Sequence, residues 1–143
     1  MYTYYIGLGS NLGDTHAHLL RAVELISQRI GQVSGLSSFH ETEPWGFCSA
    51  HRFLNAVCCV ESARQPLEML RETQLIEQLM GRKQKSADGV YHDRIIDLDL
   101  LLCFDESRQE VTLDTPQLKL PHPLMKQRDF VMNPLRELME NAE

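Results

Sequence analysis

Two aspartates, Asp97 and Asp99, interrupt the most apolar stretch of the chain, DRIIDLDLLL, which spans residues 93–102. Successive side chains of a β-strand point to opposite faces, so both carboxylates share one face, with their backbones ~7 Å apart. An ionised carboxylate that is buried without a partner costs several kcal/mol, and two neighbouring carboxylates raise each other's pKa. The pair therefore needs contact with water or a compensating positive charge.

Two kinds of compensation are open at this point. The face that carries the aspartates could be exposed to water or paired with arginines, as on many half-exposed antiparallel strands. Alternatively, the pair could bind a divalent cation. Mg²⁺ prefers hard oxygen ligands and commonly takes one or two carboxylates, with water and phosphate oxygens completing its octahedron. The D-x-D spacing alone does not decide between these readings.

Basic residues near this strand favour the cation. They are Arg82, Lys83, Lys85 and Arg94 before the aspartates, and Lys126 and Arg128 close to His122. A carboxylate-bound metal beside arginine and lysine is typical of a polyphosphate site, because the side-chain cations take the charge that the metal does not neutralise. Each basic residue taken alone would indicate only a solvated surface charge. The chain has no P-loop motif, and GLGSNLG is more typical of a tight turn than of a dinucleotide site.

Regular elements must position these residues. Apolar periodicity and turn signals predict strands over residues 2–8, 32–40, 53–61 and 94–104, and helices over 15–29 and 66–80. A short hairpin is expected around residues 110–113, and the prolines in PHPLMKQRDFVMNPLREL predict short helices.

The order β-α-β-β-α-β, followed by a short C-terminal helical extension, predicts an α+β fold. In this ferredoxin-like plan an antiparallel sheet carries two helices on one face. Alternation along the acidic strand predicts that one face points to the helices, and that face consists of Ile96, Leu98, Leu100 and Leu102.

Composition narrows the class of protein. The 143 residues are expected to form one domain, residues 1–143, and the net charge of −6 argues against a general binder of nucleic acid or anionic membranes. No stretch approaches the ~18 to 20 apolar residues of a membrane span, and MYTYYIGLGS lacks the features of a secretory signal. The four cysteines form no CxxC pair, which favours reduced thiols in a cytoplasmic protein.

Further motifs identify a family. They occur over almost the whole chain and are IGLGSNLGD, SSFHETEPWG followed by FLNAV, TQLIEQLMGR, YHDRIIDLDLLL and LPHPLMKQRDFVMNPL. In this combination and order the sequence resembles the 6-hydroxymethyl-7,8-dihydropterin pyrophosphokinases of folate biosynthesis. The resemblance implies a ferredoxin-like, usually monomeric enzyme that transfers the β,γ-diphosphate of ATP to the hydroxymethyl oxygen of a reduced pterin and releases AMP.

The resemblance also implies residue roles. Asp97 and Asp99 would hold two Mg²⁺ ions, and Arg82 and Arg94 would be catalytic residues of a mobile loop that closes over ATP. The expected ATP-binding residues are Gln74, Glu77, Lys85, Arg94, His122 and Arg128. The expected pterin-binding residues are Thr42, Pro44, Trp45, Phe53, Asn55, Tyr91 and Phe130, of which Tyr91 and Phe130 would stack on the two faces of the ring.

Two other functions remain alternatives. A different metal-dependent phosphotransferase or phosphohydrolase on this fold would consume ATP without pterin and release ADP. A non-catalytic ferredoxin-like module would bind a small ligand or a metal with no nucleotide turnover. Neither alternative gives a reason for the aromatic and amide residues expected at the pterin, so the sequence favours the pyrophosphokinase.

Overall fold

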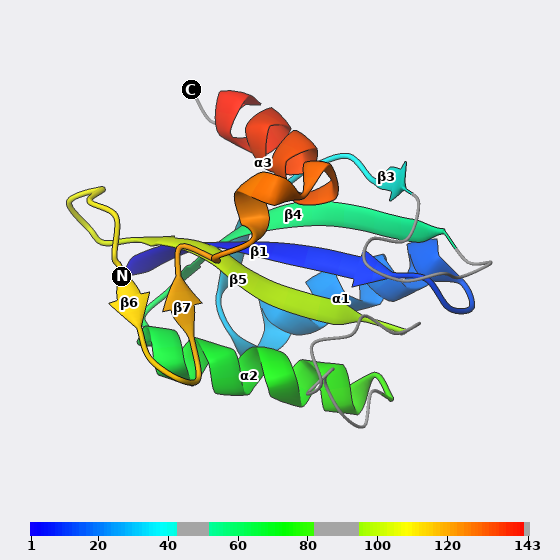
Figure 1. Ribbon diagram of the computed structural model, residues 1–143. Helices are drawn as coiled ribbons and strands as arrows, with labels where there is room; N and C mark the ends of the chain where they lie inside the picture. The colour runs from blue at the N-terminus through cyan, green and yellow to red at the C-terminus, as the bar shows by residue number, and fades with distance from the viewer. Residues whose placement is uncertain (43–51, 82–94, 142–143) are drawn as a thin grey trace.

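The structure is a computed structural model that describes residues 1–42, 52–81 and 95–141 (Figure 1). Its elements are β1 (Tyr2–Ser10), α1 (Thr15–Arg29), β2 (Gln32–Leu36), β3 (His40–Thr42), β4 (Phe53–Ser62), α2 (Pro66–Leu79), β5 (Asp97–Phe104), β6 (Leu113–Asp114), β7 (Lys119–Leu120), the 3₁₀ helix η1 (Met125–Gln127) and α3 (Asp129–Asn141). None of the helices in the described ranges is long and apolar enough to cross a membrane.

The main sheet is antiparallel. Four of its strands follow the order β2-β4-β1-β5, and the short β3 pairs with the beginning of β4. Because β1 and β2 are each antiparallel to β4, they run parallel to each other with β4 between them. A separate small sheet consists of β6 and β7. The predicted α+β class, with an antiparallel sheet and packed helices, is confirmed.

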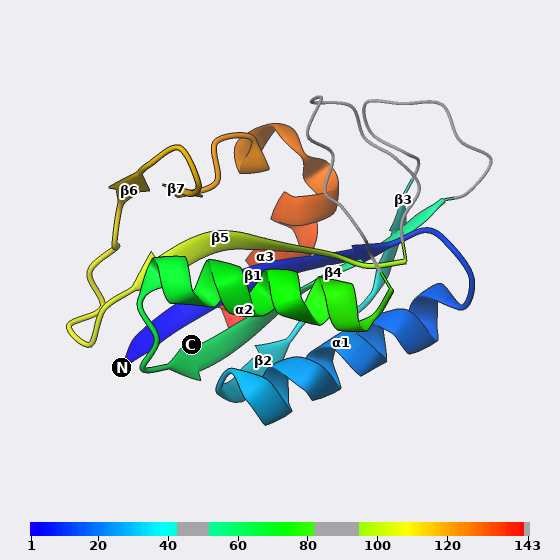
Figure 2. The ribbon, with the colours of Figure 1, turned by 90° about the horizontal axis from the view of Figure 1, so that it is seen from below.

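Helices cover both faces of the main sheet. In Figures 1 and 2, α1 and α2 lie side by side on one face and α3 lies on the other. The larger core cluster lies on the side of α1 and α2 and includes Tyr4, Ile6, Leu19, Ile26, Ile76, Leu98 and Leu100. The smaller cluster lies on the side of α3 and consists of Tyr5, Val57, Leu101, Leu102, Met125, Val131, Leu135 and Leu138.

The two long helices begin at identifiable caps. The Asp14 side chain accepts a hydrogen bond from the Ala17 N–H at 3.1 Å, so it satisfies one of the free N–H groups at the start of α1. At the start of α2, Pro66 occupies the first turn, and Gln65 and Glu68 form a capping box. The predicted bounds of α1 are confirmed, and those of α2 differ by one residue.

One part of the alternation predicted for β5 is wrong. Ile96, Leu98 and Leu100 do lie in the cluster that faces α1 and α2, but Leu102 lies in the cluster under α3. The register between β1 and β5 shifts at Tyr5 and Ile6, which pair with Leu102 and Leu100, so Leu101 is an extra residue. This β-bulge reverses the alternation after Leu100, and it leaves both Leu101 and Leu102 facing α3.

The strand predicted over residues 32–40 is interrupted. β2 ends at Leu36 and β3 begins at His40, with Ser37 between them still bonded to β4. The Ser37 N–H donates to the Val57 carbonyl and the Ser37 hydroxyl accepts from the Val57 N–H, both at 2.9 Å. The serine side chain thus replaces one ladder bond, and regular pairing stops there.

The residue ranges predicted for the hairpin and for the C-terminal helices differ from those in the structure. The hairpin expected around residues 110–113 extends further along the chain, because β6 pairs with β7 and only a single bridge joins Phe104 to Glu110. The C-terminal extension holds a 3₁₀ turn and a long helix of 13 residues, α3, which continues through Pro134. Val131, Leu135 and Leu138 pack α3 on the sheet, and this burial offsets the backbone bond that proline cannot make.

The described cysteines Cys58, Cys59 and Cys103 are free, in agreement with the expected reduced thiols. Burial raises the pKa of the Cys58 thiol to about 12 and that of Cys103 to about 11. Both side chains are therefore protonated at neutral pH and act as small apolar groups of the core.

Candidate active site

The two aspartates lie opposite two glycines. Across β1 and β5, Asp97 pairs with Gly9 and Asp99 pairs with Gly7, so all four residues share the face that carries α3. Both carboxylate side chains are half-buried. Because glycine has no side chain, β1 presents only backbone opposite each carboxylate, bordered by Leu101 at Gly7 and by the Asn55 Oδ1 at Gly9. The sequence predicted the shared face of the aspartates, and the strand register supplies the space next to them.

A first hollow lies beside these glycines, and we call it the Asn55 hollow. Its lining includes Gly7, Gly9, Phe53, Asn55, Asp97, Asp99, Leu101, Arg128 and Phe130. Phe53 and Asn55 come from the start of β4, and Phe130 comes from the first turn of α3. The hollow therefore combines two aromatic rings, one amide, one guanidinium and the carboxylate pair on a single face of the sheet.

The Asn55 amide has a defined orientation. Asn55 is 5 % exposed, and its Nδ2 donates a hydrogen bond to the Thr42 hydroxyl at 2.9 Å. Its Oδ1 points toward the backbone of Gly9, because a Cβ built on Gly9 would lie only 3.0 Å from it. The amide oxygen thus faces the open strip of β1, where it can accept a hydrogen bond from an N–H group of a ligand.

Arg128 supplies a positive charge to the same hollow. It is 4 % exposed, and its Cζ lies 5.8 Å from the centroid of the Phe130 ring. Burial lowers the pKa of the Arg128 guanidinium to about 10, which still leaves the group charged at neutral pH. The guanidinium thus brings a positive charge to the hollow that the two aspartates also line.

A second hollow, the Gln74 hollow, lies toward the β6–β7 hairpin. Its lining includes Leu70, Gln74, Leu98, Asp99, Thr115, Leu118, Lys119 and His122. The His122 ring accepts a hydrogen bond from the Leu124 N–H through Nδ1 at 3.2 Å, which fixes the tautomer with its other nitrogen as donor. Asp99 borders both hollows, so one carboxylate stands at the place where their contents would meet.

Glu77 has a different position from the other expected ATP ligands. It is 2 % exposed, and its Oε2 accepts a hydrogen bond from the Leu98 N–H at 2.8 Å. It is not among the residues that line either hollow. The carboxylate thus holds the backbone of β5 at the residue between Asp97 and Asp99, and its contact with ATP remains a prediction.

Several predicted residues lie outside the described ranges: Pro44, Trp45, Arg82, Lys85, Tyr91 and Arg94. The predicted closure of the loop after α2 lies there as well. Among the described residues, the structure brings Thr42, Phe53, Asn55 and Phe130 together at or beside the Asn55 hollow, and Gln74 and His122 at the Gln74 hollow. Arg128, expected with ATP, lines the Asn55 hollow.

Sequence reasoning missed the role of Gly7 and Gly9. Both belong to GLGSNLG, which is typical of a tight turn, and the strand predicted over residues 2–8 ends before Gly9, yet β1 continues through Gly9 to Ser10. The signal that could have found them is the alternation of glycine with Ile6 and Leu8, since a strand with bulky residues on one face and none on the other leaves one face open.

Comparison with known proteins decides the family. The family model for 7,8-dihydro-6-hydroxymethylpterin-pyrophosphokinase (HPPK) matches residues 5–140. The chain belongs to the HPPK family. The HPPK resemblance inferred from the motifs is therefore confirmed.

Curated HPPK relatives match over most of their length. A 2-amino-4-hydroxy-6-hydroxymethyldihydropteridine pyrophosphokinase from Porphyromonas gingivalis (strain ATCC BAA-308 / W83) is 51% identical over 134 residues, which cover 94% of this chain and 88% of the relative. The protein of the same name from Aquifex aeolicus is 36% identical over 142 residues, covering 99% of this chain and 83% of the relative.

Solved structures agree with the fold. A crystal structure described as HPPK-DHPS in complex with substrates matches with a TM-score of 0.70 and 14% identity over 95% of this chain, which spans 40% of that chain. A triple mutant of Plasmodium falciparum HPPK-DHPS also gives a TM-score of 0.70, with 16% identity over 96% of this chain and 40% of its own. At these identities the likeness concerns the fold alone.

Proposed function

We propose that this chain transfers diphosphate from ATP to the hydroxymethyl group of 6-hydroxymethyl-7,8-dihydropterin, giving AMP and the pterin diphosphate in tetrahydrofolate biosynthesis. Membership of the HPPK family supports the reaction. The structural observation that carries the proposal is that Asp99 borders both hollows. Two substrates bound in the two hollows would meet at the carboxylate pair, as a group transfer between them requires.

The Asn55 hollow is the proposed pterin site. A pterin is flat, and its edge carries N–H donors beside acceptor atoms. The Asn55 oxygen would accept from that edge, and the Thr42 hydroxyl that orients the amide would fix its direction. Phe130 offers an aromatic face from α3, and Phe53 an apolar wall from β4. Pro44, Trp45 and Tyr91 complete the proposed set from outside the described ranges.

The Gln74 hollow is the proposed nucleotide site. Gln74 on α2 and His122 after β7 both line it, and both can donate hydrogen bonds to a nucleotide. Arg128 would then take phosphate charge from the side of the Asn55 hollow. Glu77, Arg82, Lys85 and Arg94 are further proposed nucleotide or catalytic residues. Arg82 and Arg94 would neutralise the phosphates as the loop between them closes.

The residues present fit the Mg²⁺ ions that this family implies. Asp97 and Asp99 offer hard oxygen ligands on one face, and they line the same hollow as Gly7 and Gly9, which bring no side chain to it. Among the described residues there is no group of three or more His, Cys, Asp or Glu that could hold a metal. We propose two ions with water and phosphate as their remaining ligands. When bound, they neutralise the charge of the transferring diphosphate.

The chain's own residues would orient the reaction. Asn55 and Phe130 would hold the pterin so that its hydroxymethyl oxygen points at the β-phosphorus for in-line attack, while Gln74 and His122 hold the nucleotide on the opposite side. Arg128 would stabilise negative charge on the phosphate oxygens as the bond to AMP breaks. The apolar residues that line the Asn55 hollow, such as Phe53, Leu101 and Phe130, would limit the access of water to the reacting groups.

We propose that residues 1–143 form a single catalytic domain that acts as a cytoplasmic monomer. The fold is proposed to follow the ferredoxin-like plan. The order β2-β4-β1-β5 supports that plan if β2 and β3 count as one strand, since the first and second strands then run parallel with the third strand between them.

One incubation tests the function. The chain is mixed with ATP, Mg²⁺ and 6-hydroxymethyl-7,8-dihydropterin, and the products are separated. AMP and pterin diphosphate in equal amounts are expected. Release of ADP, or ATP consumption that is independent of pterin, would instead favour a different phosphotransferase. Ligand binding without any nucleotide turnover would favour the non-catalytic module.

A further inference from the structure

A cluster of three polar side chains lies on the α3 face, beyond the residues that line the Asn55 hollow. Glu137 on α3 accepts hydrogen bonds from the Ser38 N–H at Oε2 and from the Ser38 hydroxyl at Oε1, both at 2.6 Å. The Nε2 atom of His40 lies 3.1 Å from the same Oε1 and 3.2 Å from the Ser38 hydroxyl. We call these residues the Glu137 clamp. It joins α3 to the segment that leads into β3.

The clamp does not have the geometry of a hydrolase triad. In such a triad the acid contacts one ring nitrogen of histidine and the nucleophile contacts the other. Here the Ser38 hydroxyl and the Glu137 carboxylate both meet Nε2 of His40, and the hydroxyl donates directly to the carboxylate. The serine therefore has no free base to activate it, and the arrangement is that of a structural or positioning contact.

The clamp is next to the site on the sheet. On the face that carries α3, paired residues form a row across four strands, consisting of Asp97 on β5, Gly9 on β1, Asn55 on β4 and His40 on β3. His40 is thus the cross-strand neighbour of Asn55. Two residues further along β3, Thr42 faces the same way and accepts the hydrogen bond of the Asn55 amide.

The same helix carries the clamp and the aromatic residue of the hollow. Glu137 follows Phe130 by seven residues, so both lie on one side of α3, about 10.5 Å apart along the axis. α3 therefore offers Phe130 at its start and Glu137 two turns later, while β3 offers Thr42 at its end and His40 at its start. A bond between Glu137 and the start of β3 fixes the distance between the two elements that flank Asn55.

The charge of Glu137 is maintained by its donors. The hydroxyl and then the backbone N–H of Ser38, together with His40, hold the pKa of the Glu137 carboxyl below its usual value. The carboxylate is therefore ionised at neutral pH, and charge-assisted hydrogen bonds are stronger than neutral ones. β3 has only three residues, and its ladder to β4 is correspondingly short. The contact of Glu137 with Ser38 and His40 therefore contributes much of what holds β3 in place.

We propose that Glu137 is a positioning residue for the pterin side of the site. By joining α3 to Ser38 and His40, it holds Phe130 and Thr42 at the separation that lets Asn55 and the Phe130 ring engage one pterin. This inference rests on the proposed function, since it takes the Asn55 hollow as the pterin site. The residue touches neither substrate and acts through the placement of β3 against α3.

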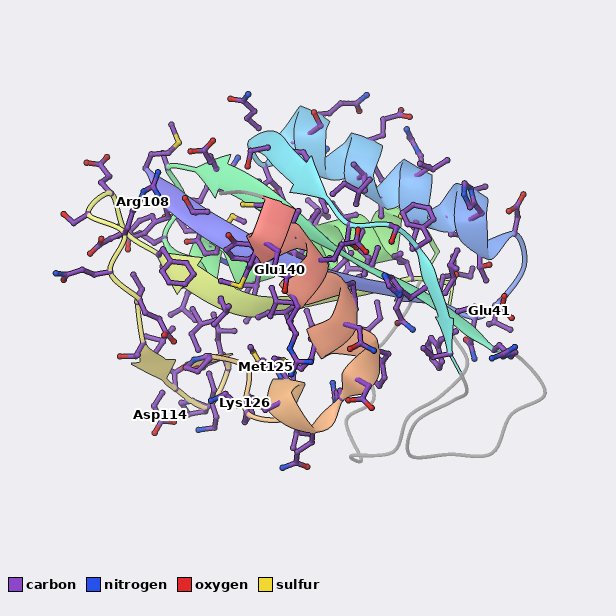
Figure 3. All side chains as sticks on the ribbon, turned by 90° about the horizontal axis from the view of Figure 1, so that it is seen from above. Glu41, Arg108, Asp114, Met125, Lys126 and Glu140 are labelled. Atoms are coloured by element: carbon purple, nitrogen blue, oxygen red, sulfur yellow. The ribbon has the colours of Figure 1, made fainter. Side chains whose placement is uncertain are left out.

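The test compares Glu137→Ala, Glu137→Gln and, as a matched control, Glu140→Ala. Glu140 is an exposed residue of the same type on the same helix, labelled in Figure 3. The dissociation constant of the reduced pterin is measured with a non-hydrolysable ATP analogue present, and that of the analogue is measured alone. Glu137→Ala is expected to weaken pterin binding about tenfold, the size of a lost charge-assisted hydrogen bond, with nucleotide binding unchanged.

The two other variants separate positioning from general stability. Glu137→Gln keeps an oxygen that accepts from Ser38, so it should recover most of the pterin affinity, and Glu140→Ala should match the wild-type chain. If Glu137→Ala does not fold, Ser38→Ala takes its place. It removes only the hydroxyl bond, and about threefold weaker pterin binding is expected.

Hydrogen exchange supplies a readout that needs no substrate. The amide of Ser38 and those of β3 should exchange faster in Glu137→Ala than in Glu140→Ala, because the Ser38 N–H loses its acceptor. Pterin affinity equal to that of the wild-type chain, or equal losses for pterin and nucleotide, would overturn the positioning role. A wild-type chain that binds pterin yet makes no AMP would overturn the proposed function and leave the clamp to be judged by binding and exchange.

Discussion

The two faces of the main sheet differ in what they bury. On the side of α1 and α2, β1 and β5 present Tyr4, Ile6, Leu98 and Leu100 to a continuous apolar core. On the side of α3, the same strands present Gly7, Gly9, Asp97 and Asp99 at one end, and they contribute Tyr5, Leu101 and Leu102 to an apolar cluster at the other. One pair of strands thus supports the fold with alternate residues and the proposed chemistry with the residues between them.

This difference predicts that neighbouring residues on one strand have separable effects. Substitutions on the face toward α1 and α2 should change the free energy of unfolding, because they alter packing in a closed core. Substitutions beside Gly7 and Gly9 should change turnover, since that face is open where the aspartates lie.

Asp97→Asn and Asp99→Asn should give the largest change. Each removes one carboxylate charge from the proposed Mg²⁺ site, and we expect turnover to fall about a thousandfold or more, the equivalent of several kcal/mol of charge stabilisation. The melting temperature should change far less than the turnover, because asparagine keeps the size of the half-buried side chain. Steady-state rates and thermal unfolding measure the two effects. Turnover equal to that of the wild-type chain, with Mg²⁺ as the only metal, would contradict the assignment of the Mg²⁺ site to these two aspartates.

Ile6→Ala should show the opposite pattern. Ile6 is fully buried in the cluster toward α1 and α2, so its truncation leaves a cavity and should destabilise the fold by about 2 to 5 kcal/mol. At a temperature where the variant is folded, its turnover number should stay within a few-fold of the wild-type value. Urea unfolding and steady-state assays are compared on the same preparation. A large loss of turnover at unchanged stability would break the proposed separation of the faces.

Gly7→Ala is the matched change on the next residue of β1. A Cβ at Gly7 would meet Leu101 at 3.5 Å, an ordinary contact, so the fold should accept it with stability unchanged or slightly raised. The added methyl group would occupy the strip opposite Asp99, and the resulting displacement of substrate should lower turnover about a hundredfold. Full activity in this variant would show that the open strip of β1 is not used.

Substitutions in the two hollows should affect the two substrates separately, and these effects should be smaller. Phe130→Ala removes the aromatic face of the Asn55 hollow and should raise KM for the pterin about tenfold, while KM for ATP changes little. Gln74→Ala should raise KM for ATP by a few-fold and leave that for the pterin unchanged, because one hydrogen bond is lost. If both variants raised both constants equally, the assignment of one substrate to each hollow would be wrong.

The parts of the fold that local pattern could predict are those with strong periodicity. The cap at Asp14 and the apolar spacing of α1 set its bounds from sequence alone. The shared face of Asp97 and Asp99 also followed from alternation. The face on which Leu102 lies did not follow from alternation. The bulge that reverses it depends on the pairing of β5 with β1 and has no signal within β5 itself.

The parts of the site that the sequence did not predict depend on contacts between distant elements. Gly7 and Gly9 acquire their role only when β1 aligns with the aspartates. The position of Glu77 depends on α2 lying beside β5, where the carboxylate accepts from the Leu98 N–H, and its expected contact with ATP stays a prediction. The prolines of the C-terminal segment predicted short helices, but the packing of Leu135 and Leu138 on the sheet supports a helix of 13 residues that continues through Pro134.

The place of β5 at the end of the strand order exposes it to a different hazard, which is addition of a strand from another molecule. Three of its backbone groups are already occupied along its length. Glu77 accepts from the Leu98 N–H, His122 donates its N–H to the Leu101 carbonyl, and Val111 donates to the Cys103 carbonyl. A foreign strand would have to displace all three contacts to pair there. The strand that carries the aspartates is thereby protected against edge-to-edge aggregation, although its apolar sequence would otherwise promote it.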